Sequence, residues 1–266
     1  MEEKRFAFGK NWLSFLDTMD EERINTAVNS LKEMLEMEDL KEKTFLDIGC
    51  GSGLFSLAAA RLGARVFSFD YDSESVACAL ELRKKYGISA ELWTIQQGSV
   101  LDREYMDKLP LFDIVYSWGV LHHTGDMRKA IENASLKVKP NGIFFLALYN
   151  DQGFLSFLWK KVKEIYCSSL AGKIIITAIF VPFLFFRSLL SGLFKNGNPL
   201  YQFSNYRKNR GMSLYHDWID WLGGYPFETS SPKDAENFLN SLGFNLRKSK
   251  LTQSWGCNEF VFIKNP

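Results

Sequence analysis

One stretch of the chain decides the fold prediction: Leu46-Asp47-Ile48-Gly49-Cys50-Gly51-Ser52-Gly53. It joins a short apolar run, Thr44–Gly49, to residues 54–62, whose apolar pattern predicts a helix. A glycine loop between a buried strand and a helix lets the backbone approach a ligand closely and directs free N–H groups toward it. The stretch therefore predicts a ligand site at the carboxyl end of the first strand.

Apolar strand-like runs alternate with helical patterns through the first 150 residues. A helix with apolar residues three or four apart precedes the first strand, and others are expected at Ser73–Tyr86, with Ser73 as N-cap, and at Met127–Val138. The further strands expected in this part are Arg65–Asp70, Ala90–Gln97, Leu111–Trp118 and Ile143–Tyr149. This alternation is typical of an α/β fold with a doubly wound parallel sheet covered on both faces.

The alternation stops after residue 150 and resumes about 80 residues later. Pro232–Leu242 is expected to be a helix, and Phe244–Leu251 and Glu259–Lys264 are expected to form an antiparallel hairpin because their connection is short. The predicted organisation is therefore in three parts: 1–150 with the N-terminal helices and the ligand loop, 151–230 as a mainly helical insertion, and 231–266 completing the sheet.

The chemistry expected of the ligand follows from two acids and the glycine spacing. Asp70, at the end of the second strand, is placed to accept hydrogen bonds from two ribose hydroxyls. The loop has the spacing GxGxG, whereas a pyrophosphate site expects GxGxxG. Asp47 is poorly placed for a pyrophosphate but well placed near an ammonium group. A ligand with a carboxylate, an ammonium group and a ribose but no phosphate is S-adenosylmethionine (SAM).

On these residues the sequence resembles the class I SAM-dependent methyltransferases, over residues 44–150 and the last 35 residues. The resemblance implies a Rossmann-like, seven-stranded sheet with an antiparallel last strand. It also implies that the DxGxGxG loop holds the methionine part of SAM, that Asp70 holds the ribose, and that Gly98-Ser99-Val100 flank the adenine. The expected cofactor-binding residues are Asp47, Gly49, Cys50, Gly51, Gly53, Asp70, Tyr71, Ser99, Val100 and Ser117.

The fourth strand runs into Ser117-Trp118-Gly119-Val120-Leu121-His122-His123. Family members that methylate planar amino groups usually carry an Asn/Asp-Pro-Pro-aromatic motif here, and its absence disfavours N-methylation. The His122-His123 pair resembles small-molecule O-methyltransferases, especially those of ubiquinone biosynthesis. An O-methyltransferase needs a base near neutral pH, so His122, His123 and His216 are the candidate catalytic residues. The alternatives are a helix-start contact for the pair and an aromatic core loop around His216.

Composition excludes several other classes. Thirty-two Lys and Arg against 31 Asp and Glu give a net charge of +1, which disfavours a uniformly basic nucleic-acid-binding protein. The four cysteines form no CxxC pair, which disfavours a zinc site or a secreted disulfide framework. The acidic and histidine residues show no metal-ligand spacing, so a metal-independent enzyme is expected. The N-terminus lacks the apolar core of a signal peptide, which predicts a cytoplasmic location.

The charge is nevertheless uneven. Residues 151–212 hold nine basic and two acidic residues, a net +7, which leaves −6 for the rest of the chain. Within them, residues 174–194 have one charge and could cross a bilayer by length. Crossing is disfavoured because the last strands must rejoin the same sheet, because Arg187 would lie near mid-depth and because Pro182 tends to break the segment. Two helices are expected instead, at Ile174–Val181 and Phe183–Phe194, serving as a buried cap, an oligomer interface or a peripheral membrane contact at the inner membrane face.

The sequence thus predicts a SAM-dependent methyltransferase that transfers a methyl group to a hydroxyl of a small or lipid-like acceptor, with S-adenosylhomocysteine as product. The alternatives are a non-catalytic SAM-binding or membrane-docking protein and a nicotinamide oxidoreductase, against which the GxGxG spacing argues. The aromatic residues of the N-terminal run are predicted either to form a lid over the cofactor or to pack a helix onto the sheet; they are Phe6, Phe8, Trp12 and Phe15.

Overall fold

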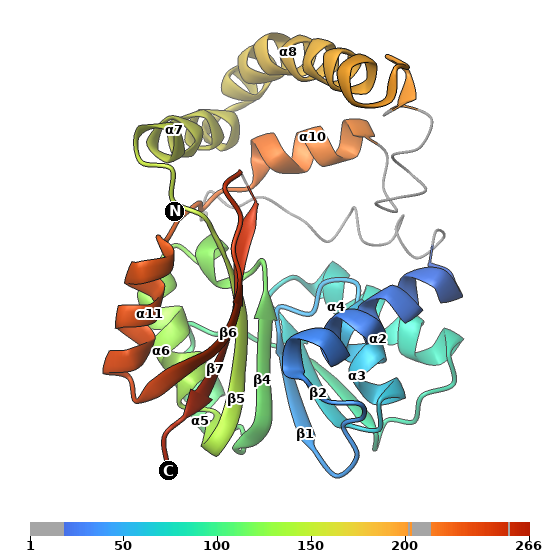
Figure 1. Ribbon diagram of the computed structural model, residues 1–266, viewed down its shortest axis with the longest axis vertical. Helices are drawn as coiled ribbons and strands as arrows, with labels where there is room; N and C mark the ends of the chain where they lie inside the picture. The colour runs from blue at the N-terminus through green and yellow to red at the C-terminus, as the bar shows by residue number, and fades with distance from the viewer. Residues whose placement is uncertain (1–18, 202, 204–213, 255) are drawn as a thin grey trace.

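The computed structural model describes residues 19–201, 203, 214–254 and 256–266. A seven-stranded sheet has the order β3-β2-β1-β4-β5-β7-β6 (Figure 1). Strands β1 to β5 pair in parallel, and β7 runs antiparallel to both of its neighbours. The doubly wound sheet with an antiparallel last strand is therefore confirmed. The strands are β1 Thr44–Ile48, β2 Arg65–Asp70, β3 Trp93–Gln97, β4 Phe112–Trp118, β5 Val138–Tyr149, β6 Phe244–Lys250 and β7 Cys257–Lys264.

Helices cover both faces of the sheet because the strands are apolar on both sides. Alternate side chains such as Phe45 and Tyr116 enter one core under α2, α3 and α4, whereas their neighbours Leu46 and Val115 enter a second core on the opposite face, under α5, α6 and α11 (Figure 1). The bounds are α2 Glu21–Leu35, α3 Leu54–Arg61, α4 Ser73–Lys85, α5 Arg103–Lys108, α6 Met127–Ser135 and α11 Pro232–Ser241, with the 3₁₀ turn η1 at Leu121–His123.

Several predicted boundaries were wrong. The N-cap of α4 is Asp72, whose carboxylate accepts from the Glu74 N–H at 2.9 Å, so Ser73 is the first helical residue. The helix expected to reach Val138 ends at Ser135, because Val138 already pairs with Phe112 as the first residue of β5. Strand β3 begins at Trp93, three residues later than expected, and the short helix α5 was not predicted.

Residues after β5 build a separate helical layer over the carboxyl ends of the parallel strands (Figure 1). It contains α7 (Phe154–Ser168), α8 (Leu170–Asn196) and α10 (Leu214–Gly223). The chain returns where it left: the Ser230 N–H donates to the Tyr149 carbonyl at 3.0 Å, and the Asp151 N–H donates to the Ser230 carbonyl at 3.2 Å. The two ends of the insertion therefore meet beside the end of β5.

Two side chains of α7 attach it to the end of α10. Lys163 is fully buried, and its ammonium group donates to the Trp221 carbonyl and lies over the Trp221 and Phe227 rings. The Cys167 thiol contacts the Gly223 carbonyl at 3.0 Å. Cations and hydrogen-bond donors are favourable at a helix C-terminus because the last carbonyls lack partners within the helix. The contacts fix α10, and with it the segment that follows, against α7.

The expectation of two helices divided at Pro182 was wrong, because α8 is one helix of 27 residues with Pro182 inside it. Proline removes one backbone hydrogen bond, but the turns on either side remain paired and packed. Buried residues recur mostly at four-residue spacing along α8 and hold it to the layer: Gly172, Ile176, Leu184, Ser188 and Gly192. At Gly172 the packing is so close that a Cβ atom would lie 2.2 Å from the Ile165 carbonyl oxygen.

We expect Gly172→Leu to separate α8 from α7, because the added side chain cannot fit between the two helices. Hydrogen–deuterium exchange should show faster exchange in α8, with sheet amides unchanged. Ala171→Leu is the control, because Ala171 is exposed on the neighbouring position of the same helix. Equal protection of α8 in both variants would contradict this packing.

Candidate active site

The glycine loop between β1 and α3 has a backbone that only glycine adopts readily. Gly49, Gly51 and Gly53 have φ angles of 73°, 52° and 81°, in the left-handed region that disfavours side chains. A Cβ atom at Gly49 would lie 2.4 Å from Val120 Cγ1, and one at Gly53 would lie 2.8 Å from the Trp93 ring. The loop is therefore tightly packed on its protein side, which leaves its backbone shape fixed.

The Asp70 carboxylate ties this loop to the end of β2. Its Oδ2 accepts from the Gly51 N–H at 2.9 Å, and its Oδ1 accepts from the Asp72 N–H at 2.9 Å. Burial raises the pKa of Asp70, which the two backbone hydrogen bonds oppose. Each carboxylate oxygen has a further lone pair, so the group can also accept from two hydroxyls of a ligand.

Two segments next to Asp70 border the side of the site on which the adenine of a bound ligand would lie. Tyr71 directly follows Asp70 and is 53% exposed, so its ring offers a surface for stacking. The turn at Gly98 donates its N–H to the Asp70 carbonyl at 2.9 Å, and a Cβ atom at Gly98 would overlap the Tyr105 ring. Ser99 and Tyr105 therefore lie close to the acid predicted to hold the ribose.

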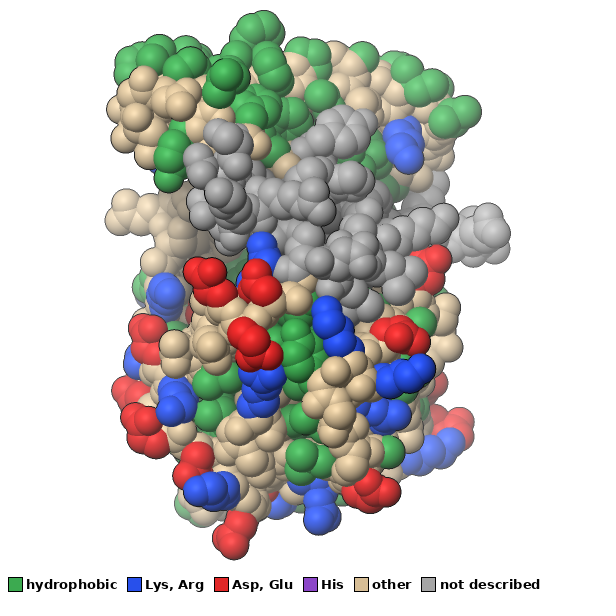
Figure 2. Space-filling model, turned by 90° about the vertical axis from the view of Figure 1, so that its right-hand side faces the viewer, with side chains coloured by type: hydrophobic (Ala, Val, Ile, Leu, Met, Phe, Trp, Pro, Cys, Tyr) green, Lys and Arg blue, Asp and Glu red, His purple; other side chains and the backbone are tan. Residues whose placement is uncertain are grey.

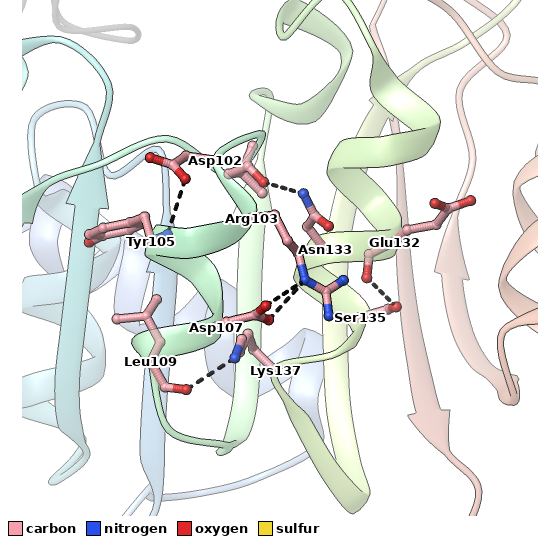
Figure 3. Close-up of polar contacts among 10 residues, drawn as sticks. Asp102, Arg103, Tyr105, Asp107, Leu109, Glu132, Asn133, Ser135 and Lys137 are labelled. Carbon is pink, nitrogen blue, oxygen red and sulfur yellow. Dashed lines mark hydrogen bonds and ion pairs between the residues drawn. The ribbon is translucent and has the colours of Figure 1, made fainter.

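The turn from Gly98 to Val100 is held in place by α5 and α6. The Asn133 side chain of α6 donates to the Val100 carbonyl at 2.8 Å, while the Ser99 hydroxyl accepts from the Leu101 N–H. Figure 3 shows the polar contacts around the two helices. Asp102 caps α5 by accepting from the Tyr105 N–H, and the ammonium group of Lys137, just after α6, donates to the Leu109 carbonyl at the end of α5 at 3.1 Å. Val100 itself is buried, so only its backbone is placed to shape a ligand site.

Asp47 is 3% exposed and faces the first turn of α3. Its Oδ2 accepts from the Ser56 hydroxyl at 2.6 Å, and no side chain caps α3 at Gly53. Burial raises the pKa of Asp47 to about 7, and the Ser56 hydroxyl only partly offsets it. A buried acid with a raised pKa is a group that a nearby cation would stabilise, because a positive charge favours its ionised form.

The other two cofactor residues predicted from the sequence are buried between strands. The Ser117 hydroxyl donates to the Ile48 carbonyl at 3.1 Å, which joins the ends of β4 and β1. Cys50 lies inside the glycine loop, and burial raises the pKa of its thiol well above the ordinary value. Ser117 therefore joins two strand ends beneath the loop, whereas Cys50 is a buried part of the loop itself. The neighbouring Trp118, at the end of β4, is 45% exposed.

His122 and His123 lie on η1, beside the end of β5. His122 is fully buried, and its Nδ1 accepts from the Tyr149 N–H at 3.4 Å. The proton of the neutral ring is therefore on Nε2, which has no hydrogen-bond partner among the described residues. Burial lowers the pKa of His122 well below its ordinary value. A buried, neutral ring whose outer nitrogen already carries a proton is a poor proton acceptor.

His123 has the opposite arrangement. Its Nδ1 lies 2.7 Å from the Pro226 carbonyl, which can only accept, so Nδ1 carries the proton and the lone pair of the neutral ring is on Nε2. The Pro226 carbonyl also fixes the orientation of the ring, as carbonyl partners do for functional histidines. Of the two histidines, His123 is therefore the one with the tautomer of a base.

The other sequence candidates are less fully placed. His216 lies on α10, but its side chain is outside the described part of the structure, as are Phe6, Phe8, Trp12 and Phe15. Within the described residues, no three His, Cys, Asp or Glu side chains come together as a metal site would require.

Residues that sequence reasoning missed join the histidines to the insertion. The Tyr149 ring lies 4.2 Å from the His122 ring and 5.1 Å from the Phe227 ring, between centroids. The Glu228 N–H donates to the His122 carbonyl at 3.0 Å, and its carboxylate accepts from the Met127 N–H at the start of α6. The Tyr225–Glu228 segment was not predicted to contact the histidines, because contacts between positions a hundred residues apart leave no local pattern.

Comparison with known proteins identifies the part of the chain that carries this site. Residues 46–146, which span the glycine loop, Asp70 and the two histidines, match the family described as methyltransferase domain. These residues form a methyltransferase domain. The match confirms the resemblance to SAM-dependent methyltransferases and the expected cofactor class.

Curated relatives of this methyltransferase domain cover only part of the chain. This chain is 33% identical over 105 residues to the ubiquinone biosynthesis O-methyltransferase of Rhizobium leguminosarum bv. trifolii, and these residues make up 40% of each of the two chains. It is 31% identical over 146 residues to the enzyme of the same name from Coxiella burnetii, which is 54% of this chain and 58% of that protein. The chain thus spans about half the length of the curated relatives it matches, and the matches leave much of it outside.

Solved structures show the same fold over a larger part of the chain. Magnesium protoporphyrin IX methyltransferase from Synechocystis PCC 6803, with bound S-adenosylhomocysteine, aligns with a TM-score of 0.55 over 91% of this chain and 82% of that one, at 13% identity. The [4+2]-cyclase SpnF aligns with a TM-score of 0.56 at 11% identity. At these identities the likeness concerns the fold, and the residues of the site must be judged from the geometry of this chain.

We expect Asp47→Asn to change the pH dependence of stability in a defined direction. The folded pKa of about 7 lies above the ordinary 3.8, so the wild type loses stability as pH rises from 4 to 7 and loses no more above 7. The difference in unfolding free energy, variant minus wild type, should therefore grow by up to about 4 kcal/mol across this window. Urea unfolding of ligand-free protein at pH 4 to 8 measures it.

Glu132→Gln is the control, because Glu132 is exposed on α6. A pH-independent difference for Asp47→Asn would show that the carboxylate of Asp47 is ionised throughout in the folded chain.

Proposed function

We propose that this chain is a SAM-dependent O-methyltransferase that acts on a hydroxyl of a small or lipid-like acceptor. The observation that carries the proposal is the glycine loop held by Asp70 at the carboxyl ends of β1 and β2. The methyltransferase domain matched over residues 46–146 supports the reaction class. The names of the curated relatives support a hydroxyl as the acceptor group.

The residues of the loop fit the parts of SAM. The close-packed turn at Gly49 to Gly53 fixes the shape of the loop backbone, and Asp70 can accept from ribose hydroxyls. The buried carboxyl of Asp47 is suited to a cation such as the ammonium group of SAM, because that charge would favour its ionised form. Tyr71 and the Gly98–Val100 turn would border the adenine. When bound, SAM supplies a methyl group made electrophilic by the sulfonium.

The chain's own contribution to the chemistry is to orient the acceptor and to take its proton. In the reaction, the acceptor oxygen forms a bond to the methyl carbon, the carbon–sulfur bond breaks, and the hydroxyl proton goes to a base. His123 is the base of this proposal because its protonated Nδ1 is held by the Pro226 carbonyl, which leaves Nε2 to accept. His122 and Tyr149 hold the His123 ring from the side of β5.

A lipid-like acceptor is the finer part of the proposal. The helical layer lies over the strand ends that carry the glycine loop and the histidines, so an acceptor reaches the site next to α7 and α10 (Figure 1). The segment that links this layer to His123 is aromatic, with Trp221 and Phe227 packed around Tyr149. Aromatic and apolar surroundings favour an acceptor with an apolar body and a hydroxyl at its end.

Calorimetry with S-adenosylhomocysteine tests the part of the proposal that concerns SAM binding. We expect binding by the wild type and affinity lower by about 10- to 100-fold in Asp70→Ala, since the loss of hydrogen bonds to a charged group is of this size. Asp20→Asn, at the N-cap of α2 away from the loop, should bind as the wild type does. Tighter binding of NADH than of S-adenosylhomocysteine would contradict the proposal and favour an oxidoreductase.

The variant His123→Gln tests the proposed transfer to a hydroxyl and the role of His123 as its base. With labelled SAM and fractionated cell extract, the wild type should transfer label to the lipid or small-molecule pool in an alkali-stable form, as expected of an ether. We expect the variant to lower kcat/KM by about 10²- to 10⁴-fold and to lose the fall in rate toward acidic pH. Its affinity for S-adenosylhomocysteine should not change. An unaltered pH profile in His123→Gln would remove His123 from the role of base.

A further inference from the structure

Most of the exposed large apolar side chains of the described residues lie on α7 and α8, on the side of the helical layer that faces away from the sheet. We name this side the outer face. It combines the exposed apolar side chains of α7 and α8, which Figure 2 shows in green at the top of the view. Its residues, each more than 40% exposed, are Phe154, Phe157, Leu158, Ile165, Leu170, Ile174, Ile175, Ile179, Phe183, Phe186, Leu190, Leu193 and Phe194.

Nothing comparable occurs on the methyltransferase domain. Its exposed large aliphatic residues, such as Leu80, Leu111 and Leu136, come from different helices and a loop. Single apolar residues on a surface are ordinary, but a contiguous patch of this extent marks a surface that another apolar phase covers. Of the three roles expected for residues 174–194, a buried cap does not describe this side of the helix, since most of it is exposed.

The charge beside the outer face indicates what that phase is. The sequences of α7 and α8 contain six basic residues and one acid, Glu164. Lys173 and Lys195 are exposed and lie near the start and the end of α8. An apolar surface with lysines at its borders is complementary to the interface of an anionic bilayer, whose headgroups attract the lysines while the acyl chains take the apolar side chains.

The path of the chain excludes a crossing, although α8 is long and apolar enough for one. Helix α8 packs along α7 and α10 through its stripe of buried residues, starting at Gly172. Both α7 and α10 are bound to the same end of the sheet, because Asp151 pairs with Ser230 and His123 binds Pro226. The two ends of α8 therefore stay on one side of a membrane, whereas a spanning helix has its ends on opposite sides.

We propose that the outer face inserts into one leaflet of an anionic phospholipid bilayer, with α8 lying in the plane of the interface. The side chains of α7 and α8 enter the boundary between headgroups and acyl chains, about 5–10 Å deep for helices of this kind. The remainder of the chain, with a net charge of −6 outside residues 151–212, faces away from the lipid. The attachment is independent of the reaction proposed above.

The geometry gives this attachment a consequence for the site. The glycine loop, Asp70 and His123 lie under the same layer whose far side meets the lipid (Figure 1). The carboxyl ends of the parallel strands then face the lipid across the helical layer (Figure 1).

Vesicle flotation tests the proposal with the full chain. We expect the wild type to float with vesicles of phosphatidylcholine and phosphatidylglycerol, and less with phosphatidylcholine alone. A variant of the outer face with Ile175, Ile179, Phe183 and Phe186 all changed to Gln should lose at least about tenfold in its partition coefficient. Lys173→Gln with Lys195→Gln should reduce binding only to vesicles that contain phosphatidylglycerol, and added salt should reproduce this effect.

The matched control carries three changes on the methyltransferase domain, Leu80→Gln, Leu111→Gln and Leu136→Gln, and should float as the wild type does. S-adenosylhomocysteine affinity of every variant reports that the domain is folded, so failure of the attachment is distinguished from failure of the proposed reaction. Equal flotation of the wild type and the outer-face variant would overturn the proposal. A second outcome would also overturn it: the wild type sediments as a dimer and does not bind vesicles, whereas the outer-face variant is monomeric. The outer face would then be covered by a second copy of this chain.

Discussion

The carboxylate of Asp70 is the contact on which the geometry of the site depends. One oxygen holds the glycine loop and the other holds the chain just before α4, so two helices begin from positions set by one buried acid. The same loop is fixed from beneath by Val120 and Trp93, which leave no room for a Cβ atom at Gly49 or Gly53. A ligand therefore meets a backbone that is already arranged, and little ordering entropy is lost on binding.

The second constraint is the joint between the sheet and the helical layer. Lys163 and the end of α10 fix the position of the segment that follows, and this segment then supplies the Pro226 carbonyl to His123. The tautomer of His123 is thus set by the insertion, although the residue belongs to the methyltransferase domain. A chain without this insertion could keep the cofactor loop and lose the orientation of the base.

Much of the fold followed from the sequence because it depends on local patterns. Apolar runs, turn glycines and the spacing of the loop gave the strands, their parallel pairing and the final hairpin, and Asp70 was found from its place at a strand end. Contacts between distant positions were not predictable in this way, such as Gly98 against Tyr105 or Glu228 against His122. The break expected at Pro182 does not occur, because the local cost of the proline is outweighed by packing along the rest of a long helix.

The net charge of +1 describes neither part of the molecule, because a basic, apolar layer lies over an acidic domain. This separation matters physically, since an anionic surface attracts one part and repels the other and so favours a single orientation. In that orientation the carboxyl ends of β4 and β5 face the lipid across the layer (Figure 1). The fold directs its ligand site toward the carboxyl ends of its strands, and the insertion determines what those ends face.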